Sequence, residues 1–319
     1  VLFTGIVLFA AAAFMGVNRR DLRDQAEGDS LLDRLRTHPL TRKIVDRLAG
    51  STRVSRIWIK TASEHQGLLI ITSYVMFLLM GVLMGPLYSL MDETLLEFAK
   101  DLPDALYAFV GVTSGDLSTP EGFYEAETFG LMAPIAVMVV AVVIGARALA
   151  GEEARRTMGL LLANPISRTR VLLEKVGAMV AYAFAVGFST FAGVWLGSLL
   201  GGLGIGAGNI AAASLLATLV GLVFGALALA LSAATGLVRV AVFGTVGAAF
   251  GFYLLNSFGS INDSLVGAAK WSPFYYYLGN EPLSNGMHWG HGALLAGLTV
   301  GLVALAVVLF RRRDLRQSA

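Results

Sequence analysis

The sequence contains two histidines whose spacing could hold a metal ion. His288 and His291 lie three positions apart in the stretch HWGH, so a helix would bring both imidazoles to one face. Carboxylates that could complete such a site are sparse nearby, and Trp289 between the histidines is typical of a helix end at a membrane interface. We therefore favour an interfacial helix end and predict no metal site.

No motif in the sequence points to enzymatic chemistry. The chain has no HExxH, GxSxG or Walker A pattern and no glycine-rich phosphate loop after a strand. It also has no cysteine, which excludes disulfides, thiolate catalysis and cysteine-based metal sites. We predict that the chain is not an enzyme, that it has no catalytic residues, and that it binds no cofactor of its own.

The densest group of charged side chains is the segment AGEEARRTMGLLLANPISRTR, residues 150–170, which lies between two long apolar runs. Glu152 and Glu153 precede Arg156 by four and three residues, a spacing that supports ion pairs on one helix face. We expect this helix to continue to Asn164, because Pro165 disfavours helix in the residue before it and can begin the next helix.

The same segment has an apolar side. Met158, Leu161 and Leu162 give the short helix an apolar face that no membrane span is expected to cover. The order is therefore a short amphipathic helix, a break, and a second helix that enters the membrane. One interpretation is a surface that another protein binds; the alternative is an ordinary hydrophilic loop between two spans.

The composition predicts that these residues belong to an all-α, polytopic membrane protein. The chain has 319 residues, of which 56% are hydrophobic and only 14% charged, whereas soluble domains carry about 25% charged residues. A span needs about 20 apolar residues. Seven segments meet this requirement: residues 1–17, 67–90, 131–149, 171–200, 210–234, 240–258 and 290–310.

The distribution of charge predicts the orientation of these spans. Residues 19–66 contain eleven Lys or Arg against seven Asp or Glu, whereas residues 92–127 contain nine acids and a single base, Lys100. By the positive-inside rule, residues 19–66, 150–170 and the tail after Phe310 are cytoplasmic. The acidic loop 92–130 and the loop 260–289 then face outward. We expect a multi-pass protein of the bacterial plasma membrane.

A repeated word predicts how the chain is divided. NRRDLRD at residues 18–24 recurs as RRRDLRQ at residues 311–317, each time directly after an apolar span. On this basis residues 1–25 would be the last span of a preceding copy of the unit, residues 26–66 a cytoplasmic linker with an amphipathic interfacial helix, and residues 67–319 a six-span unit. The basic amphipathic pattern before residue 67 is typical of a helix in the headgroup region.

Two further patterns concern the spans and their ends. The spans have no Asp, Glu, Lys or His away from their ends, which argues against an ion-coupled carrier. Glycines recur every four residues at 193/197/201, 221/225, 247/251 and 297/301, which predicts close helix packing. Thr119 and Pro120 match the N-cap and first position of a helix, and the aromatic stretch 271–282 is typical of an interfacial belt.

The stretch AGEEARRTMGLLLANPISRTRVLLEK resembles the first cytoplasmic loop of ABC-2 type permeases. That family has an acidic pair before a helix with leucines, then a Pro-hydroxyl-Arg turn and a lysine that enters the next span. The matching residues are Glu152, Glu153, Thr157, Leu160, Leu161, Leu162, Pro165, Ser167, Arg168 and Lys175. Arg156 departs from the pattern, because the family commonly has glycine there, and a stiffer helix would follow. The resemblance covers about residues 53–315 and is closest to the fused two-half permeases of antibiotic exporters, of the tetronasin-resistance kind.

The resemblance implies the membrane subunit of an ATP-driven exporter of antibiotics, drugs or other small hydrophobic compounds. Its partners would be ABC ATPase subunits, which use the ATP, together with the other permease half and membrane lipids, and no nucleic acid. It assigns the contact with the ATPase to the following residues: Glu152, Glu153, Arg155, Arg156, Thr157, Leu160, Leu161, Pro165, Ser167 and Arg168. The alternatives are a secondary transporter, an intramembrane enzyme and a non-transport membrane scaffold.

Overall fold

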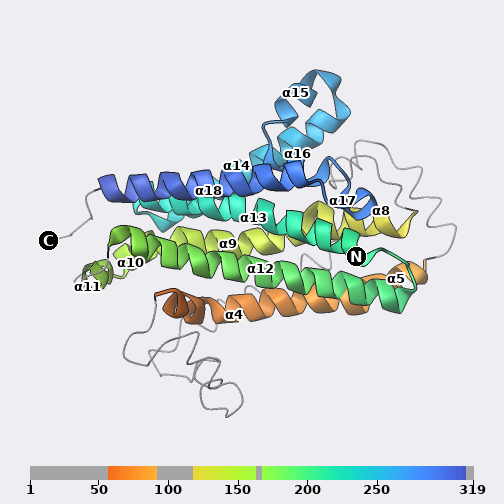
Figure 1. Ribbon diagram of the computed structural model, residues 1–319, viewed down its shortest axis with the longest axis horizontal. Helices are drawn as coiled ribbons and strands as arrows, with labels where there is room; N and C mark the ends of the chain where they lie inside the picture. The colour runs from red at the N-terminus through yellow and green to blue at the C-terminus, as the bar shows by residue number, and fades with distance from the viewer. Residues whose placement is uncertain (1–56, 92–117, 163–166, 314–319) are drawn as a thin grey trace, which may run out of the picture.

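The computed structural model describes residues 57–91, 118–162 and 167–313, and within these ranges every regular element is a helix (Figure 1). Six segments are long and apolar enough to cross a membrane. They are α4–η1–α5 (Ile57–Leu78, Leu79–Met84, Gly85–Ser89), α8–η2–α9 (Pro120–Tyr124, Glu125–Met132, Ala133–Ala148), α12 (Arg168–Gly201), α13 (Ala207–Thr235), α14 (Val238–Ile261) and α18 (Trp289–Arg312). The short helices are α10 (Ala150–Ala154), α11 (Met158–Leu162), η3 (Asp263–Leu265), α15 (Val266–Ala269), α16 (Pro273–Leu278) and α17 (Pro282–Asn285).

These helices confirm six of the seven predicted spans and the all-α membrane fold. The seventh, residues 1–17, lies outside the described residues, as does the repeated word at residues 18–24. The predicted start of a span at residue 67 lies inside α4, which already begins at Ile57. The part of the predicted interfacial helix that the structure describes is therefore continuous with the first described span.

The second described span is longer than predicted. Its helix begins at Pro120 rather than at residue 131, with Thr119 as N-cap accepting a hydrogen bond from the Gly122 amide, as the Thr-Pro pair predicts. The prediction of a loop up to residue 130 is wrong, because Glu125 lies in the π-helical turn of this span and is buried. Glu125 and Lys175, which is only 3% exposed, are buried ionisable residues, but each lies near the start of its segment, Pro120–Ala148 and Arg168–Gly201. The prediction that spans have no Asp, Glu, Lys or His away from their ends therefore holds for the described spans.

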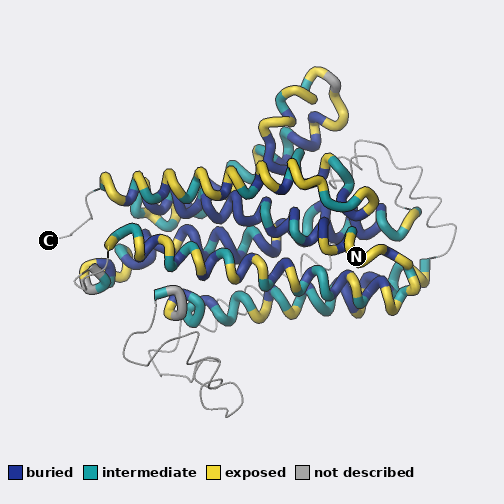
Figure 2. Tube along the Cα trace, in the orientation of Figure 1, coloured by how far each residue is buried: buried dark blue, intermediate teal, exposed yellow. Residues whose placement is uncertain are grey.

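The six spans form a bundle around α13, which packs against α9, α12, α14 and α18 (Figure 1). Figure 2 shows α13 as the most buried helix, while α14, α18 and α4 expose much of their outer surface. Those exposed surfaces carry large apolar side chains, such as Phe250 on α14 and Tyr74 on α4. A surface of this kind is suited to lipid, so the burial pattern agrees with a membrane protein.

The glycine repeats pack helices together at two of the four places where the sequence predicts it. Gly193, Gly197 and Gly201 of α12 lie against the backbone of α4, η1 and α5, and the repeat at 221/225 lies against α9. At the repeats 247/251 of α14 and 297/301 of α18, an added Cβ would meet nothing within 4 Å among the described residues. For those two repeats the predicted close packing is not seen in the described part of the chain.

The bundle has two chemically different ends. At the basic end α4 and α12 begin, α9, α13 and α18 end, and the loop helices α10 and α11 lie (Figure 1). The opposite, acidic end carries η3 and the helices α15 to α17. Its aromatic stretch is only partly an interfacial belt, because Tyr277 and Phe274 are buried and the Tyr277 hydroxyl donates to the Phe129 carbonyl. Trp271, in contrast, is 81% exposed.

The histidine pair lies at the acidic end, where α18 begins. His288 is the N-cap of α18 and its Nδ1 accepts a hydrogen bond from the His291 amide. Among the described residues, no group of three or more metal-ligating side chains comes together. His288 thus caps the start of α18, at the helix end that Trp289 and the apolar run after it predict.

Candidate functional site

The loop at the basic end is divided into two short helices by a tight turn. Helix α10 ends at Ala154, and Arg156 has a left-handed backbone with φ of 58°. The Thr157 amide then donates to the Glu152 carbonyl, and α11 follows. The prediction of one continuous helix through this stretch, with Glu152 and Glu153 paired to Arg156, is wrong. The predicted break at Asn164 and Pro165 lies outside the described residues.

Glu152 points into the protein and is 1% exposed. Its Oε1 lies 2.8 Å from Lys175 Nζ, which is itself buried in α12, and its Oε2 accepts the Thr157 hydroxyl. Lys60 Nζ lies 3.7 Å and Arg155 Nη2 3.8 Å from the same Oε1. This carboxylate therefore joins the loop to α12 and to α4.

The charge state of Glu152 follows from these contacts. Burial would raise the pKa of its carboxyl, but hydrogen bonds from Lys175 and Thr157 and the positive charge of Lys60 act in the opposite direction. Together they lower the pKa of Glu152 to about 2. The lowered pKa favours the ionised carboxylate, the form that pairs with the Lys175 ammonium.

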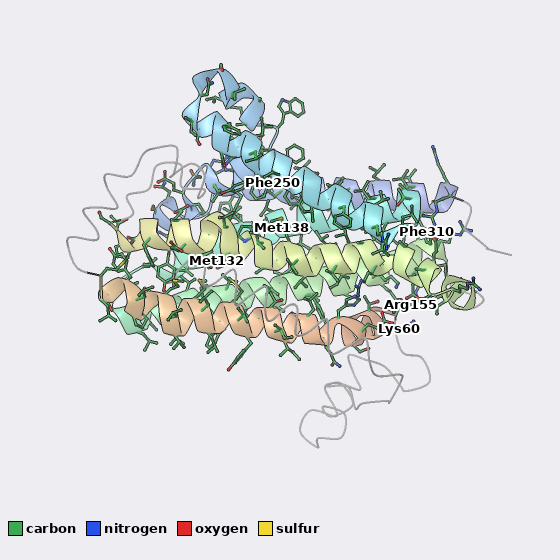
Figure 3. The ribbon with its side chains drawn as sticks, turned by 180° about the vertical axis from the view of Figure 1, so that it is seen from behind. Lys60, Met132, Met138, Arg155, Phe250 and Phe310 are labelled. Atoms are coloured by element: carbon green, nitrogen blue, oxygen red, sulfur yellow. The ribbon has the colours of Figure 1, made fainter. Side chains whose placement is uncertain are left out.

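Lys60 and Arg155 lie side by side at the basic end, on either side of Glu64 (Figure 3). Arg155 Nη2 is 3.3 Å from Glu64 Oε2, and Lys60 Nζ is 3.8 Å from Glu64 Oε1. Both cations are about half exposed, so these outer pairs are weak individually. With the contacts of Lys60 and Arg155 to Glu152, they close a ring of alternating charges that includes this buried carboxylate.

Glu153 also points inward, to the other side of the loop. Its carboxylate pairs with Arg313 at the end of α18, and the Glu153 side chain is only 6% exposed. Arg313 Nη1 also donates to two backbone carbonyls at the end of α13, those of Ser232 at 3.2 Å and Ala233 at 3.0 Å. The second acidic residue thus ties α10 to the ends of two spans.

Ser167 and Arg168 fix the start of α12. Ser167 is the N-cap, with its hydroxyl accepting from the Arg170 amide at 3.3 Å. Arg168 Nη1 donates to the carbonyls of Phe310 at 3.4 Å and Arg313 at 3.1 Å, and its guanidinium lies over the Phe310 ring. Figure 3 labels Phe310 at this end of the bundle. The beginning of α12 is therefore bonded to the end of α18.

The structure separates the predicted site residues into inward and outward groups. The acidic pair is turned inward, and Thr157, Leu161 and Arg168 are half-buried. Arg155, Arg156 and Ser167 are exposed. The Leu160 side chain and Pro165 lie outside what the structure describes. Met158 is buried with Leu172 and Phe310, so the prediction that it lies on an uncovered apolar face is wrong.

Four residues of this site were missed by sequence reasoning: Lys60, Glu64, Ser232 and Arg313. Lys60 and Glu64 have the spacing of a helix ion pair, which is a local signal. Arg313 belongs to the repeated word at the chain's end, but nothing in that word shows its partner. Ser232 is one of several serines and threonines in apolar helices, and no pattern distinguishes it.

The left-handed backbone of Arg156 is one that a residue with a Cβ disfavours, and this leads to a prediction. A left-handed conformation costs a residue with a Cβ roughly 1–2 kcal/mol, while glycine adopts it freely but loses about 0.5–1 kcal/mol of backbone entropy on folding. We expect Arg156→Gly to raise the free energy of unfolding by about 0.5–1 kcal/mol and Arg156→Val to lower it, measured by thermal unfolding in detergent. Equal losses in both variants would contradict the left-handed turn.

This turn also bears on the one departure from the loop pattern that the sequence resembles. The resemblance implies glycine at this position, and the structure shows a backbone there that glycine favours. The inference that arginine would make a stiffer helix is wrong, because no helix crosses the position. Arginine keeps the same turn and adds an exposed positive charge.

Comparison with known protein families agrees with the fold. The sequence matches the family described as ABC-2 family transporter protein over residues 65–315, which includes all six described spans except the first turns of α4. No curated protein matches the chain. The family consists of membrane transport components without a nucleotide-binding domain of their own, and they work in general with ABC ATPases. The chain belongs to the ABC-2 transporter family.

Proposed function

We propose that the chain is the permease subunit of an ATP-driven exporter and that its loop at the basic end docks onto a separate ABC ATPase. The observation that supports this most directly is the exposed turn at Arg155 and Arg156, on a loop tied to α4, α12 and α18. An exposed turn can bind a partner. A loop that is bonded to several spans can transmit a movement of that partner to the spans. A hydrophilic connection alone would not require two buried acidic residues.

The docking surface consists of Arg155, Arg156, Leu161 and Ser167. It combines guanidinium groups with a half-buried leucine, which is the mixture that protein interfaces favour. Its positive charge calls for carboxylates on the ATPase. The acidic pair, which the resemblance assigned to this contact, holds the loop in place instead.

The orientation, compartment and substrate are part of the same proposal. The positive-inside rule supports a cytoplasmic basic end, where ATP is available, in a bacterial plasma membrane. The resemblance to antibiotic-efflux permeases supports a small lipophilic substrate that passes between this unit and another permease half. The division at residues 25 and 66, with the preceding half ending at residue 25, rests on the repeated word.

Binding of the ATPase tests the proposal. We expect Arg156→Glu to weaken binding of the ABC ATPase that co-purifies with the chain by about 10- to 30-fold, the effect of losing an interface residue worth about 1.4–2 kcal/mol. The measurement is titration of the ATPase onto the chain in lipid nanodiscs. Arg312→Glu is the matched control, because Arg312 is exposed at the same end and forms no ion pair with the described residues.

Three results would contradict the proposal. One is a chain that co-purifies with no ABC ATPase from cells that express both. Another is equal binding by Arg156→Glu and by the Arg312→Glu control, which would place the contact elsewhere. Hydrolysis of ATP by the purified chain alone would also exclude the role of a permease that depends on a partner.

A further inference from the structure

We propose that Arg313 is the positioning residue through which movement of the loop reaches α13 and α18. This inference rests on the proposed docking of an ATPase and adds the route by which the docked ATPase acts on the spans. Arg313 lies directly after α18 and its side chain is 16% exposed, so it is covered by the loop and not directed at a partner.

Four helices meet at this one residue. The guanidinium donates to Glu153 of α10 and to the Ser232 and Ala233 carbonyls of α13. The Arg313 carbonyl accepts from Arg168, the first residue of α12. Arg313 itself follows the last turn of α18. A displacement of α10 therefore cannot occur without stretching bonds to three spans.

The chemistry of the junction requires an arginine. The last carbonyls of a helix have no partner within the helix and carry partial negative charge. A guanidinium presents several donors in a fixed plane, so it can bond two carbonyls on one edge and a carboxylate on another. A lysine ammonium at the same place has no fixed fork and would not hold all three acceptors in one geometry.

Gly236 lies beside the Arg313–Glu153 pair, at a position that leaves no room for a side chain. Gly236 ends α13 with φ of 65°, a left-handed conformation that a Cβ disfavours. A Cβ there would also lie 2.6 Å from Arg313 Nη2 and 2.7 Å from Glu153 Oε2. Any larger residue at 236 would push the ion pair apart, which provides a second way to disturb the junction without removing either charge.

A serine holds the other end of α10 to the same helix. The Ser232 hydroxyl accepts from the Ala150 amide at 3.0 Å and donates to the Ala146 carbonyl at 2.9 Å, and Ser232 is fully buried. The junction of α9 and α10 is thus fixed to the last turn of α13. Ala150 at the start of α10 is bonded to Ser232, and Glu153 near its end is bonded to Arg313, which contacts the Ser232 and Ala233 carbonyls. A displacement of α10 would therefore be transmitted to the end of α13.

The experiment follows the response of the far end of the bundle to ATP. The chain has no cysteine, so a single cysteine at Ser284, exposed on α17 at the acidic end, can be labelled with a maleimide dye. The Ser284 carbonyl accepts from Asn209 near the start of α13, which makes this position a reporter of α13. Labelling rates are measured in nanodiscs with the bound ABC ATPase, with and without ATP, together with the amount of ATPase bound.

The variants separate transmission from binding. We expect Arg313→Ala, Glu153→Gln and Gly236→Ala to bind the ATPase as the unchanged chain does, while the ATP-dependent change in labelling falls about 2- to 30-fold. Arg312→Ala, its exposed neighbour, should respond like the unchanged chain. Exchange of the two charges, Glu153→Arg with Arg313→Glu, should fail to restore the response, because a carboxylate would then face the carbonyls of α13.

The outcomes are distinct. A full labelling response in any of the three variants, with the junction shown to be disturbed by faster hydrogen exchange in α10, overturns the role of Arg313. Restoration by the charge exchange also overturns it, because a simple ion pair would then be sufficient. If the unchanged chain binds no ATPase, the proposed function fails and this inference fails with it. The milder Glu153→Gln keeps the test valid if Arg313→Ala does not fold.

Discussion

Lys175→Met is expected to lower the free energy of unfolding by about 3–5 kcal/mol, among the largest effects of any single substitution in the described part of the chain. Lys175 and Glu152 are both almost fully buried, and their charged atoms lie 2.8 Å apart. Removing the ammonium leaves a carboxylate in an environment with little water, where Lys60 and Arg155 are too distant and too exposed to replace it. Thermal and denaturant unfolding of the detergent-solubilised chain measure the loss.

The control for this prediction is the double variant Glu152→Met with Lys175→Met. Removing both charges removes the desolvation cost as well, so most of the stability should return. The pH dependence gives a second readout of the same pair. Because the pKa of Glu152 is lowered from 4.5 to about 2 in the folded state, its contribution is present above pH 4.5 and is lost as the pH falls toward 2. Glu152→Gln should lack that acid-dependent part, and an equal loss in single and double variants would contradict the pairing.

Gly197→Ala is expected to lower the free energy of unfolding by about 3 kcal/mol. A Cβ at this position of α12 would lie 2.3 Å from the Met80 carbonyl oxygen and 2.4 Å from the Tyr124 hydroxyl. The opposing contact is tighter still, since a Cβ at Gly85 would lie 2.0 Å from the Gly197 carbonyl oxygen. Backbone atoms cannot give way as a side chain can, so α12 would have to separate from η1 and α5.

The matched control is Gly247→Ala on α14, where a Cβ meets nothing within 4 Å. Alanine favours helix over glycine by about 1 kcal/mol, so this variant should be neutral or slightly more stable. Unfolding of both variants in the same detergent gives the comparison. Equal destabilisation at the two positions would mean that α12 and α4 do not pack as the structure shows.

The sequence was sufficient for the spans because their signal is local. An apolar run of membrane length identifies each helix wherever its partners lie. The error at residues 120–130 has the same origin: Glu121, Glu125 and Glu127 resemble a polar loop, although Glu125 is buried by packing that a local window does not include. Thr119 was predicted correctly as a cap because a cap depends on the next few residues alone.

The interior of the site could not be predicted for the opposite reason. Glu152 pairs with Lys175, and Glu153 pairs with Arg313, which lies 160 residues away in the chain. Local spacing predicted ion pairs of Glu152 and Glu153 with Arg156. The chain instead makes a left-handed turn at Arg156, and that side chain is exposed. The sequence therefore identified a charged loop between two spans, while the division of its residues into buried and exposed ones depends on tertiary contacts.

The buried and the exposed charges of the loop have different roles in this proposal. The buried acids fix the loop to α4, α12, α13 and α18 through Lys60, Lys175 and Arg313. The side chain of Arg156 lies at the surface, where a partner can reach it. Rigidity and exposure together are what a transmitting element requires, because a flexible contact would dissipate the movement of an ATPase. The alternative of a non-transport scaffold offers no reason for either feature.

The most direct test of the account is a crosslink from the loop to the ATPase. Because the chain has no cysteine, Arg156→Cys gives a single reactive position on the turn, and Ser260→Cys gives a control at the acidic end. A short cysteine-to-amine crosslinker is added to membranes that contain the chain and an ABC ATPase expressed with it. The account predicts a crosslinked product of the chain and the ATPase from position 156 and none from position 260. Absence of the product from position 156, with the ATPase present and bound, would contradict docking at this loop.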